Sequence, residues 1–441
     1  MQRLKGFLLG TGLLLVVIAG IAGWLAMPWA GALGVAVLLA LWMSFTRRGR
    51  QARSVAAVGL TTLPQRLGSS LVIVIGIAGV VGVLVALLAM AQGYRATLRK
   101  SGSTDTAIVL RGGSANEVSS VLGNDEINVI GDLPGVARDA DGEPLISPEI
   151  VVAANLPLRD GGPDDLGSVQ LRGVGPQAFA VRPNVELIDG RRFEPGLREL
   201  IAGTGARRQF AGLDVGNEIK LGSETWTVVG IFESGDSMQS EVWADAATVA
   251  SAYRRGSSRT SVLARLTGVD AFDTFKAAVD GDARLSADTM TTLEYFEKQS
   301  SQMTTILRVV GMVVGAIMAI GAVFGALNCM FAAVAARARE IATLRAIGFR
   351  GLPVVIAVML ETMLLALAGG VIGGVIAWAL FNGFTASTIA GGTGQLTFEF
   401  EVNPALLWTG IKWALAIGFV GGLYPAVRAA TLPVTAALRE S

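Results

Sequence analysis

Long apolar runs alternate with charged segments along this chain. Residues 6–46 carry no charged side chain, although Met27, Pro28 and Trp29 interrupt the run near its middle. Further apolar runs follow at residues 69–92, 304–336, 352–384 and 404–425. A helix that spans the hydrocarbon core of a membrane needs about 20 mostly apolar residues. The pattern therefore predicts an α-helical membrane protein with six spans, in which residues 1–46 form an N-terminal hairpin ahead of a four-span core.

Residues 93–303 have the mixed polar and apolar texture of a folded domain. Short runs rich in β-branched residues, bounded by turn-forming residues, predict strands at residues 105–110, 146–153, 168–174, 199–202, 218–221 and 225–232. Helical periodicity predicts helices at residues 244–253 and 270–279. We therefore expect a large α+β domain outside the membrane, with a strand-rich insertion at about residues 155–238.

Both ends of this domain continue toward the membrane as helices. Residues 71–100 and 292–336 contain few helix breakers for their length. A helix of about 40 residues is roughly 60 Å long, twice the ~30 Å thickness of the hydrocarbon core. The sequence therefore predicts stalk helices that project outward from the bilayer.

The composition agrees with a membrane protein. Of the 441 residues, 52% are hydrophobic and 16% charged, and the mean hydropathy is +0.55, which is too apolar for an ordinary soluble domain. The lipid bilayer is thus an expected partner, whereas the net charge of +1 implies no nucleic acid. Because Arg3 and Lys5 precede an apolar core, a cleaved signal peptide is the alternative for the first run. The second apolar run, which follows at once, favours the hairpin.

The orientation follows from lysine and arginine in the short loops. These residues fall on one side when the six spans are threaded alternately, and such an excess marks the cytoplasmic side. Both termini are then cytoplasmic, and residues 93–303 lie outside. The remaining connections are a cytoplasmic connector at 47–68, a cytoplasmic segment at 337–351, an outer loop at 385–403 and a cytoplasmic tail at 426–441.

The sequence offers no evident catalytic chemistry. It has no histidine and no G-x-x-x-x-G-K-[ST] loop, which excludes histidine-based catalysis and P-loop binding of ATP. Cys329 is the single cysteine and lies within a predicted span, so no disulfide is expected. Asp160, Asp164 and Asp165 offer a calcium alternative, but the neighbouring glycines and proline favour a solvated turn. We predict no catalytic, cofactor or metal site, and no enzyme activity on this chain.

Three charged residues lie in or beside predicted spans, where charges are costly. For Glu361 two interpretations stay open: an ion pair with an arginine near the cytoplasmic interface, or a role in coupling. Lys412 lies in the outer half of the last span, and snorkelling of its ammonium group outward is favoured over substrate contact. Arg308 is expected to anchor the outer end of its span at the interface.

Small residues recur within the spans. Glycines that permit close helix approach are Gly76, Gly79, Gly369, Gly370, Gly373 and Gly374. They favour a tightly packed bundle or a dimer, although spans that are simply rich in glycine remain the alternative.

A short basic amphipathic helix at residues 337–350 lies between two long apolar runs. Its Arg339-Glu340-Ile341 sequence, followed by Leu344 to Gly348, resembles the cytoplasmic coupling segment of MacB/FtsX/LolC-type ABC transporter permeases. The C-terminal run from Tyr424 to Ala430 resembles the C-terminal signature of the same family. Because the segment is charged and held between two spans, we expect it to contact a cytoplasmic partner.

The outer domain carries a second part of the resemblance. Residues 190–193, 215–217 and 226–232 are similar to the MacB-type periplasmic core domain. The resemblance covers about residues 59–441 and implies a cytoplasmic (inner) membrane protein whose outer domain is periplasmic. Two departures are the N-terminal hairpin, which lies outside the four-span family core, and the missing fused ATPase domain.

The resemblance implies a mechanotransmission mechanism. Such permeases work as dimers, so a second copy of this chain is expected, over separate ATPase subunits that bind Mg-ATP. The implied ATPase contacts are Arg337, Arg339, Glu340, Ile341, Leu344, Arg345 and Gly348. The expected function is export or extraction of an amphipathic substrate, such as a lipid, lipoprotein, peptide or drug, through a periplasmic adaptor and an outer-membrane channel. The alternative is a regulatory permease of the FtsX kind, which activates a cell-wall hydrolase without transport.

Overall fold

The computed structural model describes residues 16–61, 67–162, 165–390 and 394–431. The chain divides into two compact units. The membrane unit comprises Met1–Met90, Leu307–Asn382 and Glu401–Ser441, and the outer unit comprises Ala91–Ile306 and Gly383–Phe400. Both boundaries of the long outer segment fall inside continuous helices, which therefore belong to both units.

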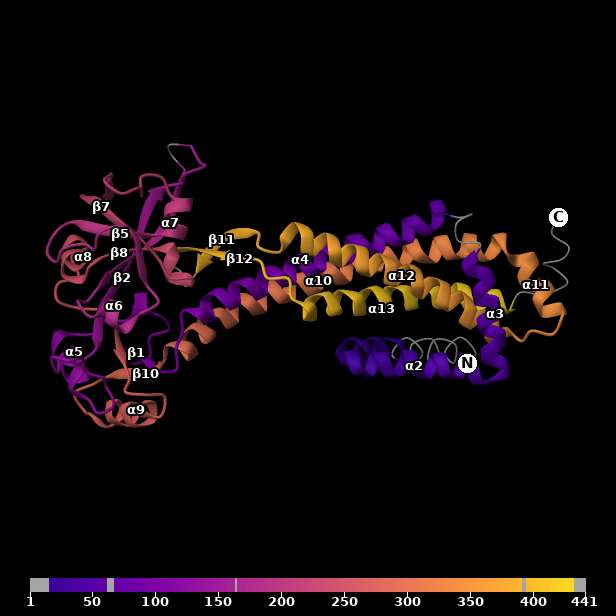
Figure 1. Ribbon diagram of the computed structural model, residues 1–441, viewed down its shortest axis with the longest axis horizontal. Helices are drawn as coiled ribbons and strands as arrows, with labels where there is room; N and C mark the ends of the chain where they lie inside the picture. The colour runs from indigo at the N-terminus through magenta and orange to yellow at the C-terminus, as the bar shows by residue number, and fades with distance from the viewer. Residues whose placement is uncertain (1–15, 62–66, 163–164, 391–393, 432–441) are drawn as a thin grey trace, which may run out of the picture. The chain divides into compact units, whose positions relative to one another are not determined.

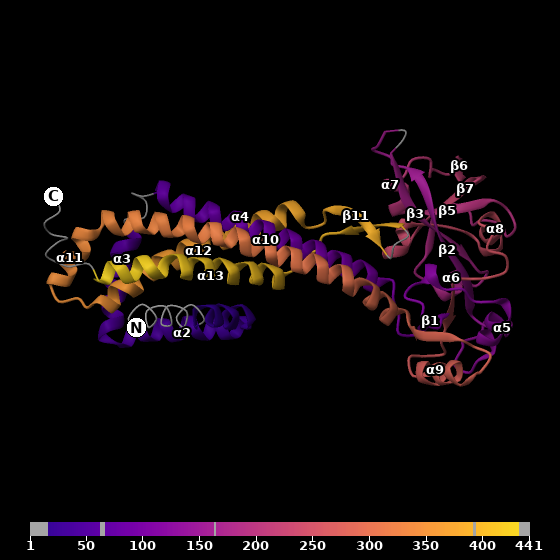
Figure 2. The same ribbon diagram turned by 180° about the vertical axis from the view of Figure 1, so that it is seen from behind.

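Four helices in the described part of the chain are long and apolar enough to cross a membrane. They are α4 (Leu67–Lys100), α10 (Thr292–Ala336), α12 (Gly351–Phe381) and α13 (Pro404–Thr431). These helices confirm the predicted four-span core and the long helices at both ends of the outer domain. In both views of the ribbon, α12 and α13 run side by side (Figures 1 and 2).

The N-terminal hairpin is a bent helix pair. A helix at Val16–Ala26 meets α2 (Trp29–Phe45) at an angle of 117°, with the break at the predicted position around Pro28. The pair qualifies only as a broken span or a re-entrant loop by length and composition. Residues 1–15 lie outside the described residues, so the two separate N-terminal spans stay a prediction.

The cytoplasmic connector predicted at residues 47–68 contains a helix, α3 (Arg47–Thr61). Its Val55 and Ala56 are buried against Ala357 of α12. The coupling segment forms the short helix α11 (Ala338–Ala346) between α10 and α12. The connector is therefore a packed part of the membrane unit.

Glycines of α12 lie against neighbouring helices with almost no space. A Cβ atom on Gly373 would be 2.4 Å from the carbonyl oxygen of Ala78 in α4, and one on Gly370 would be 2.7 Å from Ala414 Cβ in α13. Gly369 and Gly374 face the same two helices. In contrast, a Cβ atom on Gly76 or Gly79 would meet nothing within 4 Å, so these two glycines make no close contact with another helix in the described part of the chain.

The outer unit is built on a ten-stranded sheet with the order β10-β1-β9-β2-β3-β8-β5-β7-β4, where β6 also pairs with β7. Its strands are β1 (Thr106–Arg111), β2 (Ile146–Pro157), β3 (Leu166–Val174), β4 (Glu186–Gly190), β5 (Glu199–Gly203), β6 (Glu218–Leu221), β7 (Glu224–Glu233), β8 (Glu241–Asp245), β9 (Ser261–Arg265) and β10 (Ala287–Thr291). The short helices are η2 (Glu117–Ser119), α5 (Asn124–Asp132), α6 (Ala178–Val181), α7 (Thr204–Gln209), η3 (Ser237–Ser240), α8 (Ala246–Ala252) and α9 (Ala271–Gly281).

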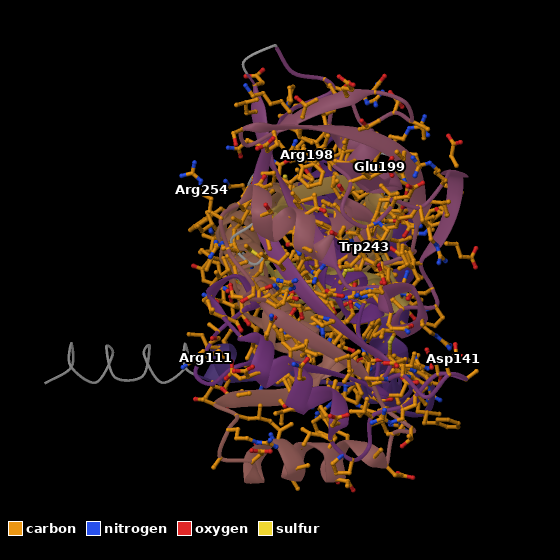
Figure 3. All side chains as sticks on the ribbon, turned by 90° about the vertical axis from the view of Figure 1, so that its left-hand side faces the viewer. Arg111, Asp141, Arg198, Glu199, Trp243 and Arg254 are labelled. Carbon is orange, nitrogen blue, oxygen red and sulfur yellow. The ribbon has the colours of Figure 1, made fainter. Side chains whose placement is uncertain are left out.

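Strand β2 joins two halves of this sheet. Its first residues pair with β9, and residues from Ile150 onward pair with β3. One hydrophobic core lies beneath β1, β9, α5 and α9, and a larger one lies among β2, β3, β5 to β8 and α8. Both views show α5 and α9 beside β1 and β10 (Figures 1 and 2). Trp243 of the larger half is fully buried, whereas Arg254 and Asp141 lie at the periphery (Figure 3).

All strands and helices predicted for the outer domain are present, with small shifts at their ends. The strand-rich stretch at about residues 155–238 is continuous with the rest of the sheet through β2 and β3. The sequence missed β4, β8, β9 and β10, each five residues long.

The outer loop predicted at residues 385–403 is a two-stranded hairpin, β11 (Thr385–Ala390) and β12 (Gly394–Glu399). It belongs to the outer unit. Thr397 donates its backbone N–H to Ser240 Oγ at 3.0 Å, and the ring of Phe398 packs edge-on against Tyr94, with 5.5 Å between ring centroids. The hairpin is therefore a structural part of the outer domain.

Candidate functional site

The coupling helix α11 is tied to α12 by a buried ion pair. Arg337, which precedes α11, donates from Nη1 to Oε2 of Glu361 at 2.9 Å. The two side chains are only 10% and 8% exposed. Arg337 Nε also lies 3.3 Å from Glu340 Oε2, on the exposed side. Of the two interpretations of Glu361, the ion pair is therefore present.

Helix α3 covers this pair at a glycine. A Cβ atom on Gly59 would lie 3.1 Å from both Arg337 Nη1 and Glu361 Oε2. That distance is shorter than nearly all real Cβ contacts, so a larger residue would displace the pair or the helix. Three segments that are distant in sequence, α3, α11 and α12, thus meet at one charged contact.

The predicted ATPase-contact residues divide between two faces of the coupling segment. Ile341 is 5% exposed, and Leu344 packs against the cluster formed by Val55, Ala56 and Ala357. Ile341 is thus buried within the chain and Leu344 is half-buried against α3 and α12, so a contact of these two side chains with an ATPase stays a prediction. Arg337 is buried in the same way.

The outward face of the segment contains the other members of the set. Arg339, Glu340 and Gly348 are exposed, and Arg345 is half-buried. Ile347, which the sequence reasoning did not single out, is 73% exposed. An exposed apolar side chain among charged residues is a candidate contact for a partner. Only the structure shows that Ile347 is exposed, because its place in the sequence fits a buried position equally well.

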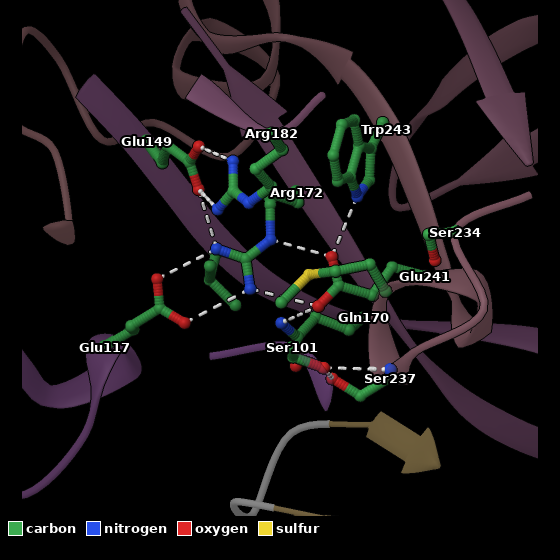
Figure 4. A network of polar contacts seen from close by, with 12 residues as sticks. Ser101, Glu117, Glu149, Gln170, Arg172, Arg182, Ser234, Ser237, Glu241 and Trp243 are labelled. Atoms are coloured by element: carbon green, nitrogen blue, oxygen red, sulfur yellow. Dashed lines mark hydrogen bonds and ion pairs between the residues drawn. The ribbon is translucent and has the colours of Figure 1, made fainter. Parts of the chain in front are cut away.

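A second buried charge cluster lies in the outer unit, centred on Arg172 of β3 (Figure 4). Its guanidinium group donates to Glu241 at 2.7 Å, and to Glu117 and Glu149 at 2.8 Å each. Arg172 is 1% exposed. A guanidinium group offers five N–H donors in a rigid plane, so one arginine holds three carboxylates that come from η2, β2 and β8.

Further polar groups complete the cluster around the carboxylates. Arg182 donates to Glu149 at 2.8 Å, and Trp243 Nε1 donates to Glu241 at 2.8 Å (Figure 4). Ser261 donates to Glu117 at 2.7 Å. Buried charges are tolerated when they are paired and hydrogen-bonded. The cluster meets that condition at every carboxylate, which identifies it as a structural lock between the two halves of the sheet.

The carboxylates of the cluster have different electrostatic environments. Burial raises the pKa of Glu149, but the charges of Arg182 and Arg172 outweigh it and hold that pKa at about 2. For Glu241, burial outweighs the attraction of Arg172, and the pKa is raised. The difference follows from the number of partners, because Glu149 pairs with two guanidinium groups and Glu241 with one.

The outer ends of the two long helices meet this cluster within the outer unit. The backbone N–H of Glu117 donates to the hydroxyl of Tyr295 in α10 at 3.3 Å. Ser101, directly after α4, accepts from the backbone N–H of Ser237 at 2.9 Å. A cavity of about 40 Å³ adjoins these contacts, which is room for water rather than for an organic ligand.

The acidic turn and two charged residues of the spans were also candidates from the sequence. Asp165 Oδ2 accepts from the backbone N–H of Gly162 at 2.8 Å, as in a tight turn, and Asp164 lies outside the described residues. No metal-binding group of three acidic, histidine or cysteine residues is found in the described part of the chain. Arg308 is exposed on α10. The ammonium group of Lys412 donates to the backbone carbonyl oxygens of Leu25 and Met27, and its outward direction stays a prediction.

Comparison with known proteins assigns both units. The MacB-like periplasmic core domain family matches residues 69–281, and the FtsX-like permease C-terminal family matches residues 312–434. Macrolide export ATP-binding/permease protein MacB from Escherichia coli (strain K12) is 28% identical over 428 residues, covering 88% of this chain and 60% of that protein. The protein of the same name from Shigella boydii serotype 4 (strain Sb227) gives the same identity and coverage. This chain thus covers 60% of the length of these relatives.

Two solved structures are also similar. The extracellular domain of the noncanonic ABC-type transporter YknZ from Gram-positive bacteria has a TM-score of 0.32 and 16% identity, covering 42% of this chain and 99% of that one. The periplasmic region of MacB from Actinobacillus actinomycetemcomitans has a TM-score of 0.32 and 14% identity, covering 43% and 90%. The two domain matches show that this chain carries a MacB-like periplasmic core domain followed by an FtsX-like permease C-terminal domain.

Proposed function

We propose that this chain is the membrane subunit of an ABC transporter whose ATPase is a separate subunit. In this proposal the partner ATPase binds and hydrolyses Mg-ATP. The permease then converts the resulting motion of the ATPase into a conformational change of its outer unit. Support for the pairing with an ATPase comes from the similarity to MacB, which is named a macrolide export ATP-binding/permease protein.

The observation that carries the proposal is the buried pair between Arg337 and Glu361. A contact that pushes on α11 acts directly on α12, because the pair joins them across a distance of 2.9 Å and is covered by α3. A buried, hydrogen-bonded charge pair resists separation more strongly than an exposed one. Motion of the coupling helix therefore moves the bundle instead of bending a loop.

The path to the outer unit is supplied by α4 and α10. Each is one unbroken helix that contributes residues to both units. Within the outer unit their ends contact the elements that hold the Arg172 cluster, through Tyr295 and Ser101. Displacement of either helix is thereby delivered to a rigid part of the sheet.

We further propose that the ATPase contacts the outward face of the coupling segment. This face consists of Arg339, Glu340, Ile347 and Gly348, with Arg345 at its border. It combines charges of both signs with one exposed apolar side chain, and that combination suits a groove with a polar rim. In this arrangement both termini and α11 are cytoplasmic, and the outer unit lies in the periplasm.

The proposed process is export or extraction of an amphipathic substrate, with a second permease copy, a periplasmic adaptor and an outer-membrane channel as further partners. Support comes from the large outer unit, since a sheet of ten strands offers the surface that a docked adaptor needs. Isolation of the complex from native membranes, followed by mass spectrometry, tests this part. An adaptor protein in the complex is the expected result, and a cell-wall hydrolase in its place would overturn the export proposal.

The ATPase contact is tested in the complex of full-length chain and copurifying ATPase. Arg339→Glu and Ile347→Glu should each lower the ATPase activity stimulated by the permease, without changing membrane insertion. Arg255→Glu, an exposed arginine of the outer unit, serves as the matched control. Full stimulation by both coupling-segment variants would show that the ATPase binds elsewhere.

A further inference from the structure

The described part of the N-terminal hairpin, residues 16–46, has little apolar attachment to the rest of the membrane unit. In α2, Ala32 is the only buried residue. Large side chains such as Leu33 and Leu38 are exposed. The hairpin also precedes the matched family regions, which begin at residue 69. Some other contact must hold it, and the described residues provide one at its break.

The break at Pro28 leaves backbone carbonyl groups without helical donors. The first helix ends at Ala26, and Pro28 has no N–H group that could continue the hydrogen-bond ladder. The carbonyl groups in the last turn of any helix need donors from elsewhere. In the hydrocarbon region of a bilayer no water supplies them, and each unsatisfied group is costly.

Lys412 of α13 is a charged donor that needs acceptors. It lies about 12 Å along the helix axis from Pro404, at a rise of 1.5 Å per residue, so its charge is far from the helix end. An ammonium group inside a membrane needs acceptors. In the structure Nζ donates to the carbonyl oxygen of Leu25, and to that of Met27 at 3.4 Å.

The contact is reciprocal. The indole Nε1 of Trp24 donates to the backbone carbonyl oxygen of Lys412 at 3.0 Å. The positive charge also lies at the carboxyl end of the first helix, where the helix dipole favours a cation. The carbonyl groups exposed by the break and the ammonium group of the span therefore satisfy each other.

We propose that Lys412 is an anchor that binds the broken end of the N-terminal hairpin to the last span of the permease core. The site consists of one ammonium donor on α13 and two backbone acceptors at the break, and Trp24 adds a second hydrogen bond in the reverse direction. The break of the hairpin is thus fixed to the last span of the core. This inference does not depend on the proposed transport function.

A cross-linking experiment on the full-length chain in native membranes tests the anchor. A diazirine amino acid replaces Met27, and mass spectrometry maps its products after illumination. In the parent chain we expect products with the segment of α13 around Lys412. Lys412→Met, which keeps the length but removes the donor, should lower their yield on the order of tenfold, because hydrogen bonds to charged groups are the strong ones. Lys412→Arg should retain most of the yield.

Two further variants separate the anchor from a general effect on folding. Trp24→Phe leaves the core untouched, keeps an aromatic ring and removes one N–H donor, so it should give a smaller loss. Lys298→Met removes an exposed lysine paired with Glu294 at 2.8 Å and should change nothing. Unaltered cross-linking in both Lys412→Met and Trp24→Phe would overturn the proposal.

Discussion

The two units each bury an arginine among glutamates, yet the two sites are built differently. In the outer unit, Arg172 is held by three carboxylates from three elements, and each carboxylate has a further donor. In the membrane unit, Arg337 has one buried partner, Glu361, and one exposed partner, Glu340, whose side chain is 54% exposed. Both arginines are buried, but the first has three buried partners and the second has one.

This difference indicates two uses of the same chemistry. A cluster in which every charge is compensated from several directions resists rearrangement, because moving one residue leaves several buried groups unpaired. A single pair at the end of a short helix joins two elements but leaves their angle adjustable. We interpret the Arg172 cluster as a rigid body and the Arg337–Glu361 pair as a joint.

The largest effect is expected at the centre of the cluster. Arg172→Met removes the guanidinium group and leaves three buried carboxylates short of a partner. Breaking a buried charge network in this way costs about 3–5 kcal/mol, so the outer unit of the purified full-length chain should melt at a much lower temperature. Circular dichroism during heating measures this. Arg255→Met is the surface control, and equal melting of both variants would show that the cluster is not a lock.

A matched pair of carboxamide variants tests the electrostatic asymmetry. The pKa of Glu149 is held at about 2, against 4.5 for the free side chain. Its charge therefore stabilises the fold above about pH 4.5, and that contribution, about 3 kcal/mol, is lost as the pH falls toward 2. Glu149→Gln should be strongly destabilised at neutral pH and lose this acid-dependent part of its stability.

The pKa of Glu241 is shifted in the opposite direction to that of Glu149. Because its pKa is raised, its contribution is full below about pH 4.5 and declines as the pH rises through the folded pKa. Glu241→Gln should therefore be destabilised less than Glu149→Gln, and its stability should decline less above pH 4.5 than that of the parent chain. Melting curves between pH 3 and pH 8 distinguish the two variants. Identical profiles would remove the basis for treating these carboxylates as different.

A smaller effect on stability, but a specific one on coupling, is expected at the joint. Glu361→Gln removes the charge facing Arg337 and leaves Glu340 as its ionised partner. A hydrogen bond between charged groups contributes about 1.5–3 kcal/mol, so transmission should weaken by on the order of tenfold. Permease-stimulated ATPase activity measures this, and the melting temperature of the outer unit should stay unchanged. A variant that melts early but couples normally would reverse the assignment of lock and joint.

The smallest change is at Gly59. Gly59→Val places a branched side chain where a Cβ atom would lie 3.1 Å from the ion pair. The helix can shift to relieve the contact, so we expect a partial loss of stimulated ATPase activity. Gly68→Val in α4 is the control, because a Cβ atom there would meet nothing within 4 Å. An equal effect at the two positions would indicate a general cost of replacing glycine in a helix.

Local features of the sequence predicted local structure well. The spans of the four-helix core follow from apolar runs, and β2, β3 and β7 follow from runs of β-branched residues, because both signals are contained within one element. Which face of α11 is buried was harder to predict from the sequence. Its apolar residues could face either a partner or the chain itself, and the packing of α3 decides between the two.

The charged contacts could not be predicted, because their partners are distant in sequence. Arg172 is 55 residues from Glu117 and 69 from Glu241, and Lys412 is 387 residues from Leu25. Glu117, Glu149 and Glu241 resemble surface residues in any local window. Only the sheet order, which places β2 next to β3 and β3 next to β8, brings them together.

The β11–β12 hairpin has a consequence for the order in which the protein is made. Residues 383–400 complete the outer unit, yet the ribosome reaches them only after α10, α11 and α12. Tyr94, which packs edge-on against Phe398, lacks this partner during that time. The outer unit is therefore complete only after this later segment of the chain has been made. A fragment of the outer unit that ends near residue 303 lacks the β11–β12 hairpin.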